Sequence, residues 1–163
     1  QLARCGATIA LHGSYRSAED ADRFIQEKAR LENAVGQPIT ANRQHYLRFL
    51  APQTAEFWQT AAIADDYTLG FAEREGFRCG TCHPYPLYDL RNDAPTAIIE
   101  HPLIAMDMTF IRYRQNDTTQ TLKKIRQLKA LCDSAEGDFV LLWHNTTVWR
   151  EYEAWFHDVF CKL

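Results

Sequence analysis

Short apolar runs recur along the chain and predict its strands. Continuous apolar segments of about four to eight residues, bounded by turn-forming residues, are typical of buried strands. We expect such strands at Thr8–Leu11, Asp66–Leu69, Ile104–Met108 and Phe139–Trp143, and an uneven strand and loop over residues 39–49.

Apolar residues at helical spacing predict helices between these strands. We expect helices at residues 18–34, 53–62, 118–132 and 147–161, and the tail of a helix at residues 1–6. Ser17 and Asp117 are residue types that cap helix N-termini, and Pro52 is well tolerated where a helix begins. The apolar spacing of the last helix predicts that Trp149 and Trp155 face inward.

The alternation of strands and helices predicts an α/β fold with a mainly parallel sheet. A complete eight-stranded (β/α) barrel usually takes roughly 250 residues. The 163 residues therefore predict an incomplete barrel formed by a single domain over residues 1–163. Residues 70–96 are rich in glycine and proline, so we expect an irregular segment, and loops of that length are usually functional.

Composition and charge argue against two classes of binding partner. The chain has 46% hydrophobic and 24% charged residues, a net charge of −3, and no basic cluster longer than Lys123-Lys124. We therefore expect neither a nucleic-acid nor a membrane partner. Five cysteines without a disulfide framework predict reduced thiols and a cytoplasmic location. The sequence gives no prediction of the oligomeric state.

Histidines end two of the apolar runs. His12 and His144 directly follow predicted strands, and side chains that carry chemistry collect beyond the carboxyl ends of parallel strands. His45 and Asp107 also lie beside predicted strand ends. One interpretation is a catalytic zinc site assembled by folding, with a further histidine that protonates the leaving group. The other is that each histidine only completes hydrogen bonds at a strand end.

The segment Cys79-Gly80-Thr81-Cys82-His83 allows several interpretations. It matches the CxxCH pattern of covalent haem attachment, for which Met106 or Met108 could be the axial ligand. A thioredoxin-like CxxC opens a helix, which Pro84 and Pro86 discourage. A zinc site would need a second cysteine pair, and the other cysteines are not paired in sequence. The remaining interpretation is a turn with two small residues.

Aromatic and arginine side chains near the predicted loops are candidate substrate ligands. Aromatic faces can stack on sugar rings, and arginine binds or orients carboxylates. We assign substrate-binding roles to Tyr15, Arg43, Tyr85 and Trp143. Asp65-Asp66 could act as a catalytic acid pair, but neighbouring strand residues point to opposite faces. The alternative is that the aromatics belong to the core and the arginines to a solvated surface.

Five segments together resemble a known family. They are Leu11-His12-Gly13-Ser14-Tyr15, Arg43-Gln44-His45-Tyr46-Leu47-Arg48-Phe49, Leu69-Gly70-Phe71-Ala72, Gly76-Phe77-Arg78-Cys79-Gly80-Thr81-Cys82-His83-Pro84-Tyr85 and Leu142-Trp143-His144-Asn145. In this order they resemble the divergent bacterial branch of the polysaccharide deacetylases, relatives of carbohydrate esterase family 4. The resemblance covers nearly the whole chain and accounts for the CxxCH segment without haem.

The resemblance implies a distorted (β/α) barrel in which one aspartate and two histidines hold a divalent metal, usually zinc. An aspartate base activates water against an N-acetyl or O-acetyl carbonyl of a carbohydrate, and a late histidine protonates the leaving group. The resemblance implies that His12 is the first metal ligand and His144 the general acid. It also implies that Arg78 and His83-Pro84-Tyr85 form the loop that steadies the base and lines the groove.

The chain departs from the family pattern at two places. The second metal histidine normally lies four residues after the first, where this chain has Arg16, and His45 is expected to replace it. The early aspartate pair lies on a first strand that would precede Gln1, so we expect the C-terminal portion of a domain, inactive alone. The expected function is a metal-dependent deacetylase-like hydrolase acting on a bacterial polysaccharide or glycan. The alternative is a non-catalytic carbohydrate-binding or scaffold module.

Overall fold

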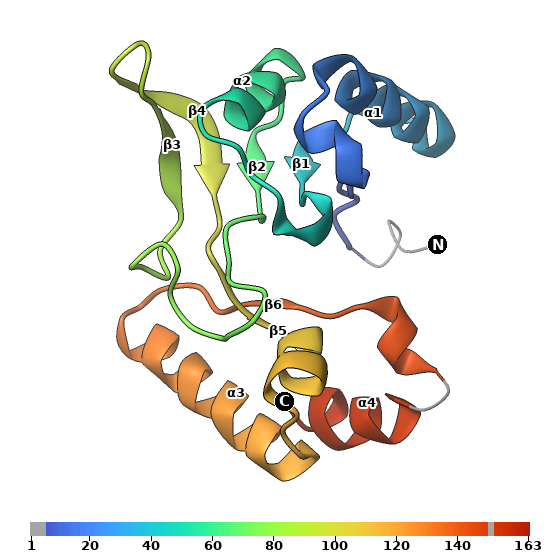
Figure 1. The fold of residues 1–163 in the computed structure, drawn as a ribbon, viewed down its shortest axis with the longest axis vertical. Helices are drawn as coiled ribbons and strands as arrows, with labels where there is room; N and C mark the ends of the chain where they lie inside the picture. The colour runs from blue at the N-terminus through green and yellow to red at the C-terminus, as the bar shows by residue number, and fades with distance from the viewer. Residues whose placement is uncertain (1–5, 150–151) are drawn as a thin grey trace. The chain divides into compact units, whose positions relative to one another are not determined.

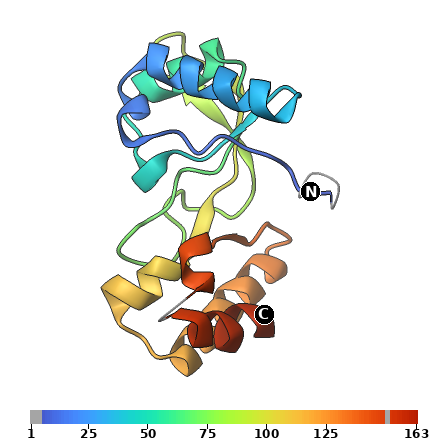
Figure 2. The same ribbon diagram turned by 90° about the vertical axis from the view of Figure 1, so that its right-hand side faces the viewer.

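The chain divides into two compact units. The computed structural model describes residues 6–149 and 152–163, and Figures 1 and 2 show it from two directions. Unit 1 comprises Gln1–Leu69 and Pro84–His101, and unit 2 comprises Gly70–His83 and Pro102–Leu163.

Unit 1 is built on a four-stranded sheet. Its elements are η2 (Tyr15–Ala18), α1 (Ala21–Val35), β1 (Ala41–Asn42), η3 (His45–Leu47), α2 (Gln53–Thr60), β2 (Asp65–Asp66), β3 (Tyr85–Asp89) and β4 (Ala94–Glu100). The strand order is β1-β2-β4-β3, in which β1, β2 and β4 are parallel and β3 is antiparallel to β4. The predicted strand Thr8–Leu11 is reduced to one parallel bridge between Leu11 and Asn42.

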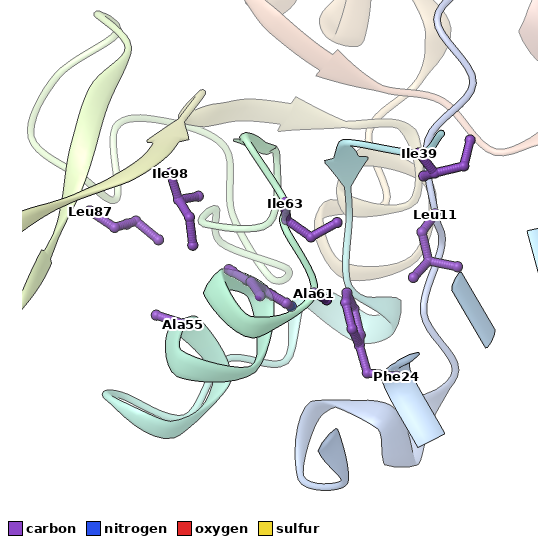
Figure 3. Packing of buried hydrophobic residues seen from close by; sticks show 9 residues of the cluster. Leu11, Phe24, Ile39, Ala55, Ala61, Ile63, Leu87 and Ile98 are labelled. Atoms are coloured by element: carbon purple, nitrogen blue, oxygen red, sulfur yellow. The ribbon is translucent and has the colours of Figure 1, made fainter. Parts of the chain in front are cut away.

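Two helices cover the sheet of unit 1. Phe24 of α1 and Trp58 of α2 are fully buried against Ile39, Ile63 and Ile98, which lie in the strands or just before them. Figure 3 shows Phe24 and the isoleucines in this cluster. Burying a side chain of this size contributes about 1.5–3 kcal/mol. The cluster therefore fixes α1 and α2 on the sheet and leaves the carboxyl ends of the parallel strands at one edge.

Unit 2 has a two-stranded parallel sheet and a helical layer. Its elements are β5 (Leu103–Met106), the π-helical η4 (Thr109–Arg114), α3 (Thr118–Ser134), β6 (Val140–Leu142), η5 (Asn145–Val148), α4 (Glu153–Val159) and η7 (Phe160–Lys162). Its core contains Phe110 of η4, Ile125 and Leu128 of α3, and Val159 of α4. These contacts hold α3 and α4 together.

Several predicted helices are confirmed. Helix α3 is capped by Asp117, whose side chain accepts the Gln120 N–H at 2.7 Å while Gln120 reaches back to the Asp117 N–H. Helix α2 begins directly after Pro52. Helix α1 begins later than predicted, because its N-cap is Asp20 and not Ser17. Residues 1–5 of the predicted N-terminal helix tail lie outside the described residues.

The hairpin of β3 and β4 corrects the prediction of irregular structure up to residue 96. Its turn is closed by Asp89, whose Oδ1 accepts the N–H groups of Arg91 at 2.8 Å and Asn92 at 3.1 Å. Pro86 fits in β3 because that strand is at the edge of the sheet, where proline is tolerated. Residues 70–83 are irregular, as expected.

The predicted final helix is also corrected. Residues Asn145–Val148 form η5, Trp149 has an extended backbone with 67% of its surface exposed, and α4 begins at Glu153. Trp155 packs against the unit 2 core as predicted. The prediction that Trp149 faces inward is therefore wrong.

The predicted α/β class with mainly parallel strands is confirmed, although the described strands form sheets of four and two strands and no closed barrel. In the part of the chain that the structure describes, no helix has the length and apolar character needed to cross a bilayer.

Candidate functional site

The carboxyl ends of β1, β2 and β4 carry a row of buried polar side chains. Asn42, Asp66 and Glu100 end these strands in register with one another, and each is 0% exposed. Asn42 Nδ2 donates to Asp66 Oδ1 at 2.9 Å, and the Leu69 N–H donates to Glu100 Oε1 at 2.8 Å. These bonds join the end of β1 to the end of β2, and the segment after β2 to the end of β4.

Two carboxyl groups of this row lie on neighbouring strands. Asp66 and Glu100 are paired in register across β2 and β4, and Glu100 is close enough to influence the pKa of Asp66. Burial raises the pKa of Asp66, and hydrogen bonds from Glu100, Thr68 and Asn42 partly offset that rise. Burial also lowers the pKa of the nearby Arg43, an effect that the charge of Asp66 opposes. Two buried carboxyl groups therefore lie near the partly buried guanidinium of Arg43.

This pair gives a pH-dependence with a defined sign. A carboxyl group whose pKa is raised by folding stabilises the fold most below its unfolded pKa of about 4, and that contribution is lost as the pH rises through its folded pKa. Glu100→Gln removes the second carboxyl group and keeps a donor for Asp66. We compare the melting temperature of Glu100→Gln with that of the natural chain at each pH. As the pH rises, the natural chain loses the stability that the raised pKa provides, so the melting temperature of the variant minus that of the natural chain should increase. A difference that is constant with pH would contradict a raised pKa at this pair of carboxyl groups.

Two histidines from different segments meet at the same edge. His12 Nδ1 lies 2.8 Å from the Arg43 carbonyl oxygen, and His12 Nε2 lies 2.8 Å from His45 Nδ1. Because a carbonyl only accepts, His12 Nδ1 carries a proton, and neutral His12 accepts at Nε2 from His45 Nδ1–H. The carbonyl of Arg43 thus orients His12, and His12 orients His45.

A glycine permits this approach. A Cβ atom at Gly13 would lie 2.7 Å from both Gln44 Oε1 and Ser17 Oγ. Gln44 is buried, and its Nε2 donates to Ser17 Oγ at 2.9 Å. Because Gly13 has no side chain, Gln44 can pack against the turn that contains Ser17. This packing places His12 and His45, the neighbours of Gly13 and Gln44, close together.

The histidine pair fits part of a divalent metal site. Zinc–nitrogen bonds of about 2.0–2.1 Å place two imidazole nitrogens on a tetrahedral zinc about 3.3 Å apart. The distance of 2.8 Å between His12 Nε2 and His45 Nδ1 is about half an ångström shorter. Metal-binding histidines usually donate their other N–H to a carbonyl or carboxylate, as His12 does. Among the described residues, however, no group of three or more His, Cys, Asp or Glu could hold a metal ion.

His101 is a neighbour that the sequence analysis missed. Its ring stacks on Tyr67 with centroids 4.4 Å apart, and its Nε2 lies 2.9 Å from Asp65 Oδ1. Arg43 Nε donates to the Tyr67 carbonyl at 3.0 Å. Asp65 is partly exposed whereas Asp66 is buried, so only Asp66 joins the buried row, as the strand geometry predicts.

Exposed aromatic rings lie next to the histidine pair. Tyr46 is 73% exposed, and its ring contacts those of His45 and Tyr15 with centroids 4.6 Å and 5.6 Å apart. Its backbone is left-handed, with φ of 57°, a conformation that non-glycine residues adopt mainly where the surroundings impose it. The Arg48 guanidinium lies 4.0 Å from the Tyr15 ring centre and is paired with Glu19. These rings form an open surface that a ligand can reach.

A second histidine site lies in unit 2. Asp107 follows β5 and is 0% exposed, and His144 follows β6. Asp107 Oδ1 lies 2.6 Å from His144 Nδ1 and accepts the Met108 N–H at 2.7 Å. Asp107 Oδ2 accepts the His144 N–H at 2.8 Å and lies 2.9 Å from Thr147 Oγ1. The carboxylate accepts from these groups, so it fixes His144 with Nδ1 protonated, while the single proton of the Thr147 hydroxyl can also go to the His144 carbonyl at 2.7 Å. The His144 side chain is 36% exposed.

The other predicted site residues have contacts of their own. Arg78 Nη1 donates to the Gly70 carbonyl at 2.9 Å and so braces the 70–83 segment. Tyr85 packs against the core of unit 1. Trp143 packs against the core of unit 2, including Trp155. The structure therefore brings His12, His45, Arg43 and Tyr15 together in unit 1, while Arg78, His144 and Trp143 lie in unit 2.

The chain has the α/β fold of a solved protein. The similarity covers 99% of the chain with a TM-score of 0.71 and 17% sequence identity. That structure is the crystal structure of a "putative polysaccharide deacetylase" from Mycobacterium smegmatis, and the chain spans 58% of its length. No protein-family model matches the chain, and no curated protein matches it by sequence. The resemblance found in the sequence is thus supported at the level of the fold.

Proposed function

We propose that the chain is part of a metal-dependent hydrolase that removes N- or O-acetyl groups from a bacterial polysaccharide or glycan. The observation that carries this proposal is the contact of His12 with His45, in which a backbone carbonyl orients two imidazoles from separate segments. Two nitrogens presented in this way suit a divalent cation, with zinc as the first candidate.

In this proposal His12 and His45 hold the metal, and a ligand from outside the described residues completes the site. A bound divalent metal would lower the pKa of a water molecule and polarise the acetyl carbonyl. Near the metal, the chain's own residues hold the imidazole rings of His12 and His45 in place. Arg43 does this through its carbonyl, and its side chain is held in turn by Tyr67 and the charge of the Asp66–Glu100 pair.

His144 is the proposed general acid. With Nδ1–H donated to Asp107, its Nε2 is the nitrogen that can carry a second proton and deliver it to the leaving amine or alcohol. The carboxylate of Asp107 stabilises the resulting imidazolium and remains ionised. Arg78 is proposed to act indirectly, because it braces the irregular 70–83 segment.

The carbohydrate partner is proposed from the exposed rings. Tyr15 and Tyr46 offer apolar faces with polar edges, which suit the faces and hydroxyl groups of sugar rings. Arg43 is the proposed polar contact at the same edge, whereas Tyr85 and Trp143 contribute mainly by packing in their own units.

Zinc binding to the intact protein that contains this chain tests the proposal. At a free zinc concentration about 100 times the dissociation constant, binding adds about 2.7 kcal/mol of stability, so the melting temperature should rise by roughly 5–10 °C. His12→Ala should abolish the rise. His83→Ala is the matched control, because His83 is exposed and belongs to the CxxCH segment. An unchanged melting curve of the natural protein, or a rise that depends on His83, would contradict the proposal.

A non-catalytic carbohydrate-binding module is the second candidate. Two observations favour it: the exposed tyrosines beside His45, and the lack of a third metal ligand among the described residues. Such a module would bind acetylated oligosaccharides without releasing acetate and would be insensitive to zinc.

A further inference from the structure

Two buried cysteines contact each other in unit 2. Cys82 ends the CxxC of the irregular 70–83 segment, and Cys132 lies in the last turn of α3, with exposures of 5% and 0%. Both are free thiols in the same buried core cluster, and the neighbouring Cys82 thiol contributes to the raised pKa of Cys132. Cys79, the other cysteine of the motif, is only half-buried, and Cys161 is exposed.

The backbone at Gly137 and Asp138 links the two cysteines. The Gly137 N–H donates to the Cys132 carbonyl at 2.9 Å, and the Asp138 N–H donates to the Cys82 carbonyl at 3.0 Å. A Cβ atom at Gly137 would lie 2.4 Å from Cys82 Sγ. Only glycine at this position therefore leaves room for the Cys82 sulfur beside the C-terminal turn of α3.

We propose that Cys82 and Cys132 are a disulfide-forming pair, which fastens the end of the 70–83 segment to α3 when the protein meets a low-molecular-weight disulfide. The Cys82 thiolate attacks one sulfur of R–S–S–R, which forms a mixed disulfide and releases one R–S⁻. The Cys132 sulfur then attacks Cys82 Sγ and displaces the second R–S⁻. Both cysteine protons end on the released thiols, so two cysteines are oxidised and one small disulfide is reduced to two R–SH.

The two thiols differ in reactivity. Burial raises the pKa of the Cys132 thiol to about 11, which makes it the poorer nucleophile, and Cys82 keeps 5% of its surface exposed against 0% for Cys132. The reaction therefore needs a disulfide that exchanges with Cys82 first, and Cys132 acts only as the resolving thiol. This assigns to the CxxC segment a role that involves Cys82 without its sequence partner Cys79.

Peptide mapping of the intact natural protein tests this pair. The protein is incubated with excess oxidised glutathione, quenched with acid, alkylated with iodoacetamide under denaturing conditions, digested and analysed by mass spectrometry. We expect the peptides of Cys82 and Cys132 to be joined with the loss of two hydrogen masses, while Cys79 and Cys161 are alkylated. The melting temperature should rise by roughly 10 °C because the bond closes a loop of about 50 residues, and dithiothreitol should reverse both changes.

Two variants complete the test. Cys132→Ser should abolish the cross-link and the thermal shift, whereas Cys161→Ser, which alters an exposed thiol, should retain both. If Cys132→Ser folds poorly, the peptide map of the natural protein is sufficient to test the proposed disulfide. Cys82 found alkylated, left as a glutathione adduct, or joined to any residue other than Cys132 would overturn the proposal.

Discussion

Replacing Asp107 with asparagine is expected to destabilise unit 2 by about 1–3 kcal/mol, the usual cost of leaving a buried donor without an acceptor. The carboxylate faces four donors, two on each oxygen: the N–H groups of Met108 and His144, the His144 ring and the Thr147 hydroxyl. An asparagine amide must turn its NH₂ group toward at least one N–H donor whichever way it is placed, because each carboxylate oxygen accepts at least one N–H. Denaturant unfolding of the intact protein measures the loss.

Asp133→Asn is the matched control for this substitution. Asp133 is paired with Lys129 four residues earlier on α3, and both side chains are more than half exposed. Surface pairs of this kind contribute little, so the control should stay within about 0.5 kcal/mol of the natural protein. Equal stability of Asp107→Asn and Asp133→Asn would show that Asp107 does not organise the His144 loop.

His144→Ala is expected to lower acetate release from an acetylated oligosaccharide by roughly 10²- to 10⁴-fold, the usual contribution of a general acid. The Asp107 carboxylate holds the ring through Nδ1, and the partly exposed ring leaves Nε2 to deliver the proton. An activated aryl acetate has a leaving group that needs no proton. The same variant should therefore lose much less activity on that ester.

His157→Ala provides the control for the loss of a histidine in the same unit, since His157 is exposed on α4. It should keep the natural activity on both esters. An equal loss by His144→Ala on the oligosaccharide and on the aryl ester would mean that His144 supports the structure and does not supply the proton.

Local sequence signals were sufficient for part of the fold. The Asp117 cap and the apolar spacing of α3 are complete within one segment, and the structure confirms them. His12 and His45 could be proposed together because each follows or adjoins a predicted strand, and the structure shows them in contact. Features carried by short segments, such as a helix cap or a histidine at a strand end, were therefore predictable from the sequence.

Features set by register between distant strands were not accessible. The row of Asn42, Asp66 and Glu100 depends on the pairing of β1, β2 and β4, which no single segment specifies. A usable signal existed, because Asp65-Asp66 and Glu100 each follow a short apolar stretch, as His12 does. The β3–β4 hairpin was missed for a related reason: Pro86 breaks a central strand but is compatible with an edge.

The assignment of Asp107 changed for a similar reason. Its position at the end of β5 suggested a metal ligand, whereas all of its described contacts go to donors, and His144 is its ring partner. Only the parallel pairing of β5 with β6 brings these two residues together. The metal, its identity and the carbohydrate substrate remain predictions that the experiments above address.

Acetate release by the intact protein tests the central claim most directly. The protein is loaded with zinc and incubated with acetylated oligosaccharides, and free acetate is followed over time beside the His12→Ala variant. We expect steady acetate release by the natural protein and loss of this release in the His12→Ala variant. Oligosaccharide binding by the zinc-loaded natural protein with no acetate above the buffer control would contradict a hydrolase and favour the binding module.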